Sequence, residues 1–222
     1  MKSRLFLFYL ALPFALAALH SCGKNDVTKT SPKLSAISSF SIEPISMEEF
    51  DRVPPTPNAA DITESTWFLS DETGVTIFAT AEDVHFWHND EIGEDYALYS
   101  FEGFFGNGQF ALVEGIHLEW TTHTLVNLET AERNSFWGKP VFSKNGALVI
   151  SYSFDPIAGF MPNGFQLFSL KNGTFSLLLQ HEFEEWGPYE MRWESDSTLV
   201  TKRVSYNNDY EEEIDFIRVV LK

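Results

Sequence analysis

The residues of this chain whose types and spacing could do chemistry are mainly His and carboxylate side chains. His117, Glu119 and His123 occupy alternate positions around Trp120. If this segment is a strand, alternate residues share one face, so the three side chains would lie together. Two imidazoles and a carboxylate are ligands that Zn²⁺ accepts. A solvent-facing strand whose other face buries Trp120 explains the same pattern, and it is the interpretation we favour over a zinc site.

A second group of oxygen ligands lies in a Gly-containing loop and consists of Asp90, Glu91, Glu94 and Asp95. Ca²⁺ prefers such ligands, so a calcium loop is one interpretation. The alternating Asp/Asn positions of a calcium-loop template are missing, which favours a solvated turn. Upstream, His85 and His88 are three residues apart and point to opposite faces of a strand, so no metal pair is predicted there.

Paired carboxylates beside aromatic rings also occur in glycosidase clefts. Glu182, Glu184 and Glu185 flank Phe183 and Trp186 in this way, but nothing in the sequence places two of them across a cleft. An exposed acidic loop is the simpler explanation. The chain has no nucleophile elbow, phosphate-binding Gly loop, HExxH motif or Cys–His pair. We therefore expect a protein that is not an enzyme.

Apolar residues in two Gly-containing segments predict a contact surface. Phe104 and Phe105 lie in the segment 101–108, and Phe160 and Met161 lie in 155–164. Apolar residues in loops are harder to explain than aromatic residues in a core. We expect these four residues to contact a protein or glycan partner.

The elements that must position these residues are predicted to be strands. Asn-Gly occurs at 107, 145, 163 and 172, each time between apolar runs, and this dipeptide is the strongest short-range hairpin signal. No window has helical periodicity. The sequence predicts an all-β antiparallel meander over residues 64–222, in which the run 214–221 completes the sheet that begins near Trp67.

Two internal echoes suggest a repeat. A shift of 51 positions superimposes the segment that starts at Phe142 on the segment that starts at Trp193, and a shift of 42 superimposes Leu125 on Leu167. A period in the forties with a turn and an apolar strand is typical of propeller blades.

The segments GKPVFSKNGALVIS and LFSLKNGTF resemble WD40-like propeller repeats, over residues 121–205. The resemblance extends to uncharacterised bacterial WD40-like proteins and implies a β-propeller-like fold with no known activity. Residues 64–222 are too few for four full blades of about 40–45 residues. We therefore expect a small or incomplete β-propeller-like domain, with a β-sandwich as the alternative.

The amino terminus indicates export. Lys2 and Arg4 precede an apolar run at 5–19, as in a secretory signal. The sequence Leu-His-Ser-Cys that ends at Cys22 resembles the lipobox of bacterial lipoproteins, which implies cleavage before Cys22 and a diacylglycerol on its thiol. We expect a signal peptide at 1–21 and a lipidated, flexible tether at 22–63. The resemblance implies a bacterial outer-membrane location that faces the periplasm or the cell surface.

The net charge of −17 disfavours phosphate-bearing partners, so nucleic-acid binding is not expected. The sequence favours a lipid-anchored, non-enzymatic binding or scaffold module without a cofactor, Ca²⁺ remaining the one candidate. The alternatives are a carbohydrate-binding or hydrolytic envelope protein that uses the acidic and aromatic loops, and a structural spacer.

Overall fold

The computed structural model describes residues 37–56 and 66–222 within a unit that comprises residues 33–222. These residues form fifteen strands and one short helix, and all strand pairs are antiparallel. The prediction of an all-β antiparallel fold is confirmed. The signal peptide, Cys22 and residues 23–36 and 57–63 of the expected tether lie outside the described residues.

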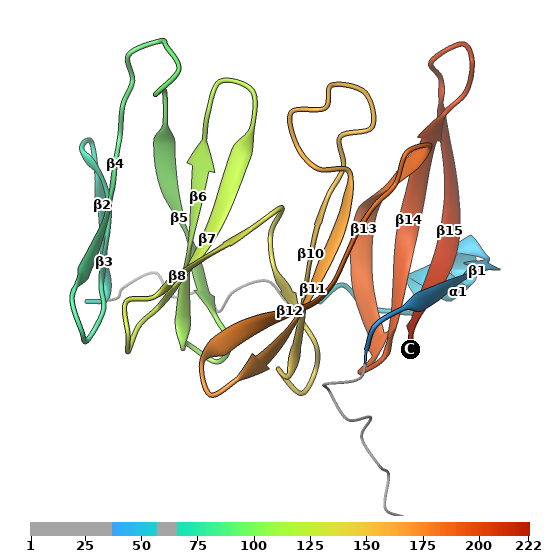
Figure 1. The fold of residues 1–222 in the computed structure, drawn as a ribbon, viewed down its shortest axis with the longest axis horizontal. Helices are drawn as coiled ribbons and strands as arrows, with labels where there is room; N and C mark the ends of the chain where they lie inside the picture. Colours follow the sequence, from blue (N-terminus) through green and yellow to red (C-terminus); the bar gives the residue numbers. More distant parts are fainter. Residues whose placement is uncertain (1–36, 57–65) are drawn as a thin grey trace, which may run out of the picture. The chain divides into compact units, whose positions relative to one another are not determined.

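The strands form four sheets that follow the chain order (Figure 1). The first sheet contains β2 (Phe68–Asp71), β3 (Gly74–Phe78) and β4 (Asp83–Trp87). The second contains β5 (Leu98–Phe105), β6 (Phe110–Ile116), β7 (Thr121–Asn127) and β8 (Arg133–Phe136). The third contains β9 (Val141–Phe142), β10 (Leu148–Ser153), β11 (Gly164–Lys171) and β12 (Thr174–Glu182). The fourth contains β13 (Trp186–Ser195), β14 (Thr198–Tyr206), β15 (Glu212–Leu221) and β1 (Phe40–Ile45).

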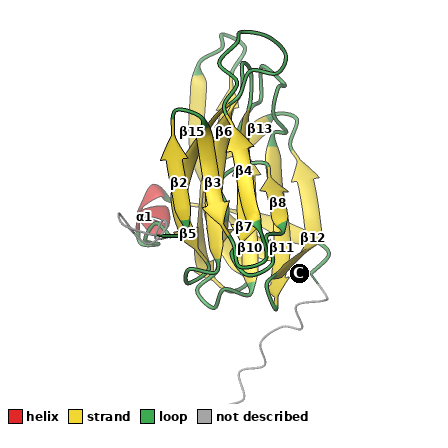
Figure 2. Cartoon of the chain, turned by 90° about the vertical axis from the view of Figure 1, so that its left-hand side faces the viewer, coloured by secondary structure: helices red, strands yellow, loops and turns green. Residues whose placement is uncertain are grey.

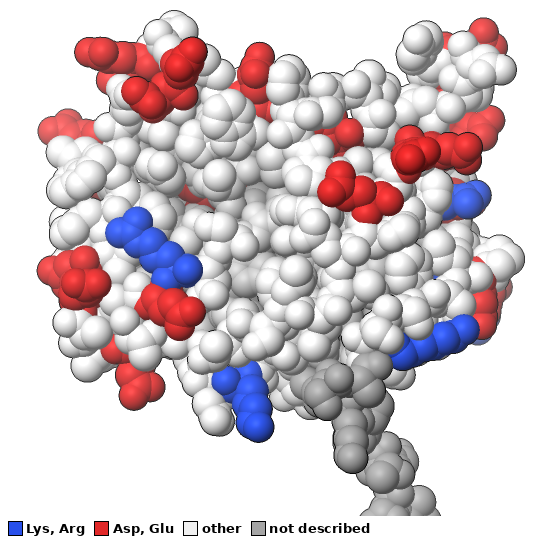
Figure 3. Space-filling model, viewed as in Figure 1, with Lys and Arg blue, Asp and Glu red and all other residues white. Residues whose placement is uncertain are grey.

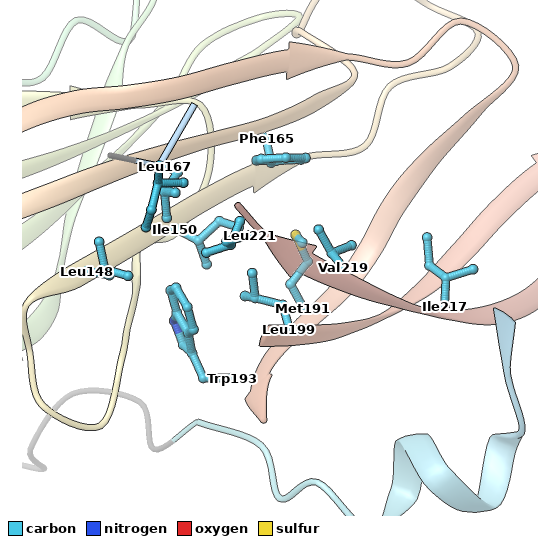
Figure 4. Packing of buried hydrophobic residues seen from close by; sticks show 11 residues of the cluster. Leu148, Ile150, Phe165, Leu167, Met191, Trp193, Leu199, Ile217, Val219 and Leu221 are labelled. Atoms are coloured by element: carbon cyan, nitrogen blue, oxygen red, sulfur yellow. The ribbon is translucent and has the colours of Figure 1, made fainter. Parts of the chain in front are cut away.

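Three apolar cores hold neighbouring sheets together. Val75 and Ile77 of the first sheet pack against Val113 of the second, and Phe110 and Leu112 of the second pack towards the third. The third and fourth sheets share the largest core, which Figure 4 shows as facing side chains from β10–β11 and β13–β15. Because strand residues alternate between faces, the second and third sheets each contribute to two cores. In the described part of the chain no such core joins the fourth sheet to the first, so the sheets form an open stack.

The two outer sheets of this stack differ in how they are covered. The helix α1 (Met47–Asp51) places Phe50, which is fully buried, against Val200 and Phe216 on the outer face of the fourth sheet. The outer face of the first sheet is turned to the viewer in Figure 2, with no labelled element in front of it. Among residues 37–56 and 66–222, the stack is therefore capped at one end only.

The folded region begins earlier than residue 64, where the sequence placed the end of a flexible tether. β1 pairs with β15 along its whole length, from Phe40 opposite Leu221 to Ile45 opposite Phe216. The expectation that the carboxy-terminal run joins the strand near Trp67 is wrong, because β15 pairs with β14 and β1. This pairing joins distant parts of the chain, so local sequence pattern does not reveal it.

The two sequence echoes fall on equivalent strands. The shift of 51 relates β9 and β10 to β13 and β14, which are the first and second strands of consecutive sheets in chain order. The shift of 42 relates β7 to β11, the third strands of the second and third sheets. The repeat in the sequence is thus a repeat of sheets.

Candidate binding surface

Two of the four residues expected to make contacts are core residues. Phe104 is only 3% exposed and packs in the core between the first and second sheets, and Phe105 packs in the core between the second and third. The prediction of a contact role for these two residues is wrong. They end β5 on opposite faces of the sheet, and each face is covered by a neighbouring sheet.

The other two, Phe160 and Met161, lie in the loop that joins β10 to β11 at the upper end of the stack in Figure 1. Phe160 is 52% exposed and Ile157 in the same loop is 63% exposed, while Met161 is half-buried. We call residues 154–163 the contact loop. It is the part of the predicted contact surface that the structure leaves accessible.

A carboxylate inside the contact loop holds its backbone in place. Asp155 accepts hydrogen bonds from the backbone N–H of Ala158 (3.0 Å) and of Met161 (2.8 Å). Burial alone would raise the pKa of Asp155, but these N–H donors and those of Gly159 and Phe160 lower it below its usual value. These hydrogen bonds close the loop around the Asp155 carboxylate and fix the backbone that carries the exposed apolar side chains.

Asn163 connects the contact loop to the fourth sheet. Its amide donates to the backbone oxygens of Phe183 and Trp186, each at 2.9 Å, and its oxygen accepts from Asp155 N–H at 3.3 Å. A Cβ at Gly187 would clash with this amide, so the close approach requires glycine. The Asn163 side chain therefore joins the β10–β11 loop to the connection between β12 and β13. The Asn-Gly pair at 163 does not form the expected hairpin turn.

Aromatic rings continue the surface beside the contact loop. Phe154 makes an edge contact with Tyr189 (5.8 Å between centroids) and stacks on Tyr206. Tyr189 is exposed. Arg203 forms an ion pair with Asp215 and lies over the ring of Trp186. Aromatic residues with polar tips are typical of contact surfaces because they bury a large area with few rotatable bonds.

The uppermost loops on the face shown in Figure 3 carry Asp and Glu, whereas Lys and Arg lie lower. These loops include the four carboxylates at 90–95, where Asn89 organises the turn by accepting from Glu91 N–H and donating to the Asp95 carbonyl. In the described residues no group of three or more His, Cys, Asp or Glu side chains could hold a metal ion. The structure does not bring Asp90, Glu91, Glu94 and Asp95, the residues considered as calcium ligands, together.

The expected zinc ligands are also separated. Residues 117–120 form a turn, closed by a bond from His117 N–H to the Trp120 carbonyl, and not the strand that alternation required. His117 stacks on Trp120 and contacts Thr122, whereas His123 lies on β7 with Nε2 3.5 Å from Oε1 of Glu114. Glu119 is exposed in the turn. The shared face expected for His117, Glu119 and His123 is wrong, because the reversal of the chain breaks the alternation. The favoured interpretation, a strand whose other face buries Trp120, is also wrong, since Trp120 is 38% exposed in the turn.

The carboxylates considered for catalysis lie at the end of β12 and in the connection after it. Glu182 ends β12 opposite Gly164, and Glu184 and Glu185 are exposed before β13 begins. No hydrogen bond or ion pair in the described residues joins these three to one another. Glu182 therefore lies at the base of the contact loop, and Glu184 and Glu185 follow it in the chain.

Sequence reasoning missed a pocket of about 310 Å³ between α1 and the fourth sheet. It is lined by Arg52, Lys144, Arg218 and Trp193 among others, and by Glu49 and Glu194. Arg218 binds Glu194 through two nitrogens, at 2.8 and 3.0 Å, so most of its charge is neutralised within the protein. No sequence signal indicated this pocket, because its lining comes from segments far apart in the chain.

Comparisons of this chain with protein-family models, with curated proteins and with solved structures found no match. The described part of the chain contains no helix with the length and apolar character needed to cross a membrane. The structure itself describes this chain as a stack of four antiparallel sheets, with an apolar loop whose backbone is held by Asp155 and Asn163.

Proposed function

We propose that this chain is a lipid-anchored, non-enzymatic binding or scaffold module of the bacterial outer membrane, with a WD40-like repeat domain. The observation that carries the proposal is the contact loop, in which exposed Ile157 and Phe160 sit on a backbone fixed by Asp155 and Asn163. Exposed apolar residues on a rigid base favour binding, because little conformational entropy is lost when a partner covers them. The lipobox-like sequence at Cys22 supports the anchor, and the repeat of sheets supports the WD40-like interpretation.

The partner that fits this surface is a protein. Glu182 lies opposite Gly164 at the base of the contact loop, and Glu184 and Glu185 are exposed just after it in the chain. A partner with apolar side chains and basic residues beside them would therefore be complementary. Its contacts would come from the contact loop and from Tyr189.

The test is a comparison of partners recovered by in-cell cross-linking and affinity purification. The full-length protein is compared with the double variant Ile157→Ala plus Phe160→Ala. We expect the cross-linked partner to fall at least fivefold in the variant, because the loop's apolar area is lost while its backbone bonds remain.

Leu177→Ala is the matched control, since Leu177 is 53% exposed on β12, away from the contact loop. It should recover the same partners as the wild type. Equal recovery from the double variant and the wild type would contradict a contact role for the loop.

A further inference from the structure

The outer face of the first sheet carries side chains that the proposed function does not use. Along β4 exposure alternates, so Val84 and Phe86 face the second sheet while His85 and Trp87 face outwards. Trp87 is 61% exposed, and Leu69 on β2 is 50% exposed on the same face. Large apolar side chains in one exposed group mark interaction sites more often than chance.

The corresponding face at the other end of the stack shows what a covered sheet looks like here. There α1 buries Phe50 and Val53 against Val200, and Arg192 lies over the Phe50 ring at 4.1 Å. Figure 2 shows the face of the first sheet without such a helix. An accessible Trp and Leu at one end contrast with a capped end at the other.

The rings on this face are held in a fixed arrangement. Thr76 Oγ1 lies 3.0 Å from His85 Nδ1, and the His85 ring stacks on Trp87 with centroids 5.0 Å apart and planes 10° from parallel. Because neighbours already hold the Trp87 ring, less side-chain entropy is lost on binding.

Carboxylates stand beside the rings. Asp71 is paired with Gly74, which is in turn opposite Trp87, so these three positions form one row across the sheet. Asp83 precedes His85 by two residues on the same side of β4. The outer face therefore combines stacking surface with hydrogen-bond acceptors at its corners.

The size and charge of the face indicate which ligands or partners could bind there. Three strands about 4.8 Å apart, of four, five and five residues, cover roughly 240 Å². A stable protein interface buries about 800 Å² on each partner, so this face alone is too small for a second copy. Two chains of net charge −17 would also repel each other, and the carboxylates disfavour anionic polymers.

A short chain of neutral sugars is compatible with both the small area of this face and its carboxylates. The C–H face of a pyranose ring stacks on an indole, and its hydroxyls donate to carboxylates. A face of this length accommodates about three rings end to end, at roughly 5 Å for each sugar and 17 Å for five strand residues.

We propose that the outer face of the first sheet binds a neutral oligosaccharide, with Trp87 stacking on a sugar ring and Asp71 and Asp83 accepting hydrogen bonds from its hydroxyls. This site is separate from the contact loop and does not depend on it.

The test is isothermal titration calorimetry of the full-length protein in a sugar-free detergent at pH 7. The probes are hexasaccharides of β-1,4-linked glucose, of mannose and of N-acetylglucosamine, with hexagalacturonate as the anionic comparator. We expect at least one neutral hexasaccharide to bind, and hexagalacturonate to bind at least tenfold more weakly. Trp87→Ala should weaken the neutral binding at least tenfold, and Asp83→Asn at least threefold.

Trp120→Ala is the matched control, because Trp120 is an exposed Trp that lies outside the first sheet, in the turn between β6 and β7. It should bind as the wild type does. The proposal is overturned if no neutral hexasaccharide binds the wild type, if both Trp87→Ala and Asp83→Asn bind within twofold of it, or if sedimentation shows Trp87-dependent dimers. Partner recovery through the contact loop should be unchanged in Trp87→Ala, so failure of one proposal leaves the other standing.

Discussion

At the scale of single residues, polar side chains fix this fold where strands end. Asp155 and Asn163 close the contact loop, and Asn127 is buried at the opposite end, where its amide donates to the Gly173 carbonyl at 3.2 Å. Asn127 thereby joins the second sheet to the β11–β12 turn. Such side chains satisfy backbone groups that strand pairing leaves without partners.

The contact loop should lose its order when Asp155 loses its charge. Asp155→Ala removes the acceptor of several backbone N–H groups, so amides 158–161 should exchange with deuterium at least tenfold faster. The lowered pKa means that this order is present above the usual Asp pKa and is lost as pH falls through the folded value. Hydrogen exchange measured by mass spectrometry checks both effects, and unchanged exchange in the variant would contradict the role given to Asp155.

His123 should make stability depend on pH. Burial lowers its pKa, Lys139 acts in the same direction, and Glu102 opposes them. In the unfolded chain His123 binds a proton near pH 6.5, whereas in the folded chain it binds that proton only at lower pH. The folded state therefore loses stability as pH falls below about 6.5. His123 Nδ1 has no hydrogen-bond partner in the described structure, so a protonated ring would leave a buried donor unpaired.

The measurement is urea unfolding of wild type and His123→Gln at pH 7.5, 6.5 and 5.5. The difference between the two free energies of unfolding should shift in favour of the variant as pH falls. A constant difference would show that His123 does not titrate in this window. His181→Gln, at an exposed histidine of β12, is the control for the method.

At the scale of elements, the short helix α1 is stabilised by a cap at its first turn and by packing of its buried side. Ser46 and Glu49 form a capping box, in which each side chain bonds to the other's backbone N–H. Five residues are too few for an isolated helix, so packing of Phe50 must supply its stability. Arg192 adds a bond of 2.7 Å to the Val53 carbonyl.

Phe50→Ala should therefore destabilise the whole unit. Loss of a fully buried Phe typically costs about 3–5 kcal/mol, through lost transfer energy and the cavity left behind. Met47→Ala on the exposed side of the same helix should change stability by less than about 0.5 kcal/mol. Urea unfolding of both variants checks this, and a loss below about 1 kcal/mol for Phe50→Ala would mean that the helix is not a structural cap.

At the scale of the whole molecule, the amino-terminal strand completes the last sheet. β1 and β15 pair over six residues, which links a segment of the expected tether to the carboxy terminus. In the sequence, seventeen residues separate Cys22, the proposed site of lipid attachment, from Phe40, where β1 begins.

Cys22→Ser should release the protein from the membrane. Without the thiol no diacylglycerol can be attached, and the described part of the chain has no spanning helix to replace it. Fractionation should move the protein from the membrane to the soluble fraction, and labelled palmitate should no longer be incorporated. Incorporation of labelled palmitate into the variant at the wild-type level would contradict lipidation at Cys22.

The sequence by itself determined the fold class and most of the strands. Asn-Gly pairs between apolar runs predicted antiparallel hairpins, and the internal echoes marked equivalent strands of successive sheets. Of the four Asn-Gly pairs, the pair at Asn172 forms a two-residue turn with both residues at positive φ, as its chemistry predicts. Local pattern suffices for these features because hairpin partners are neighbours in the chain.

Only the tertiary structure decided which apolar residues are accessible and which polar ones meet. Phe104 and Phe160 have similar sequence surroundings, yet one lies between two sheets and the other at the tip of a loop. β1 fell within the expected tether because its partner β15 is more than 170 residues away, and an edge strand tolerates its Pro44. Burial depends on which sheets stack, and stacking is set by contacts between segments that the sequence pattern does not relate.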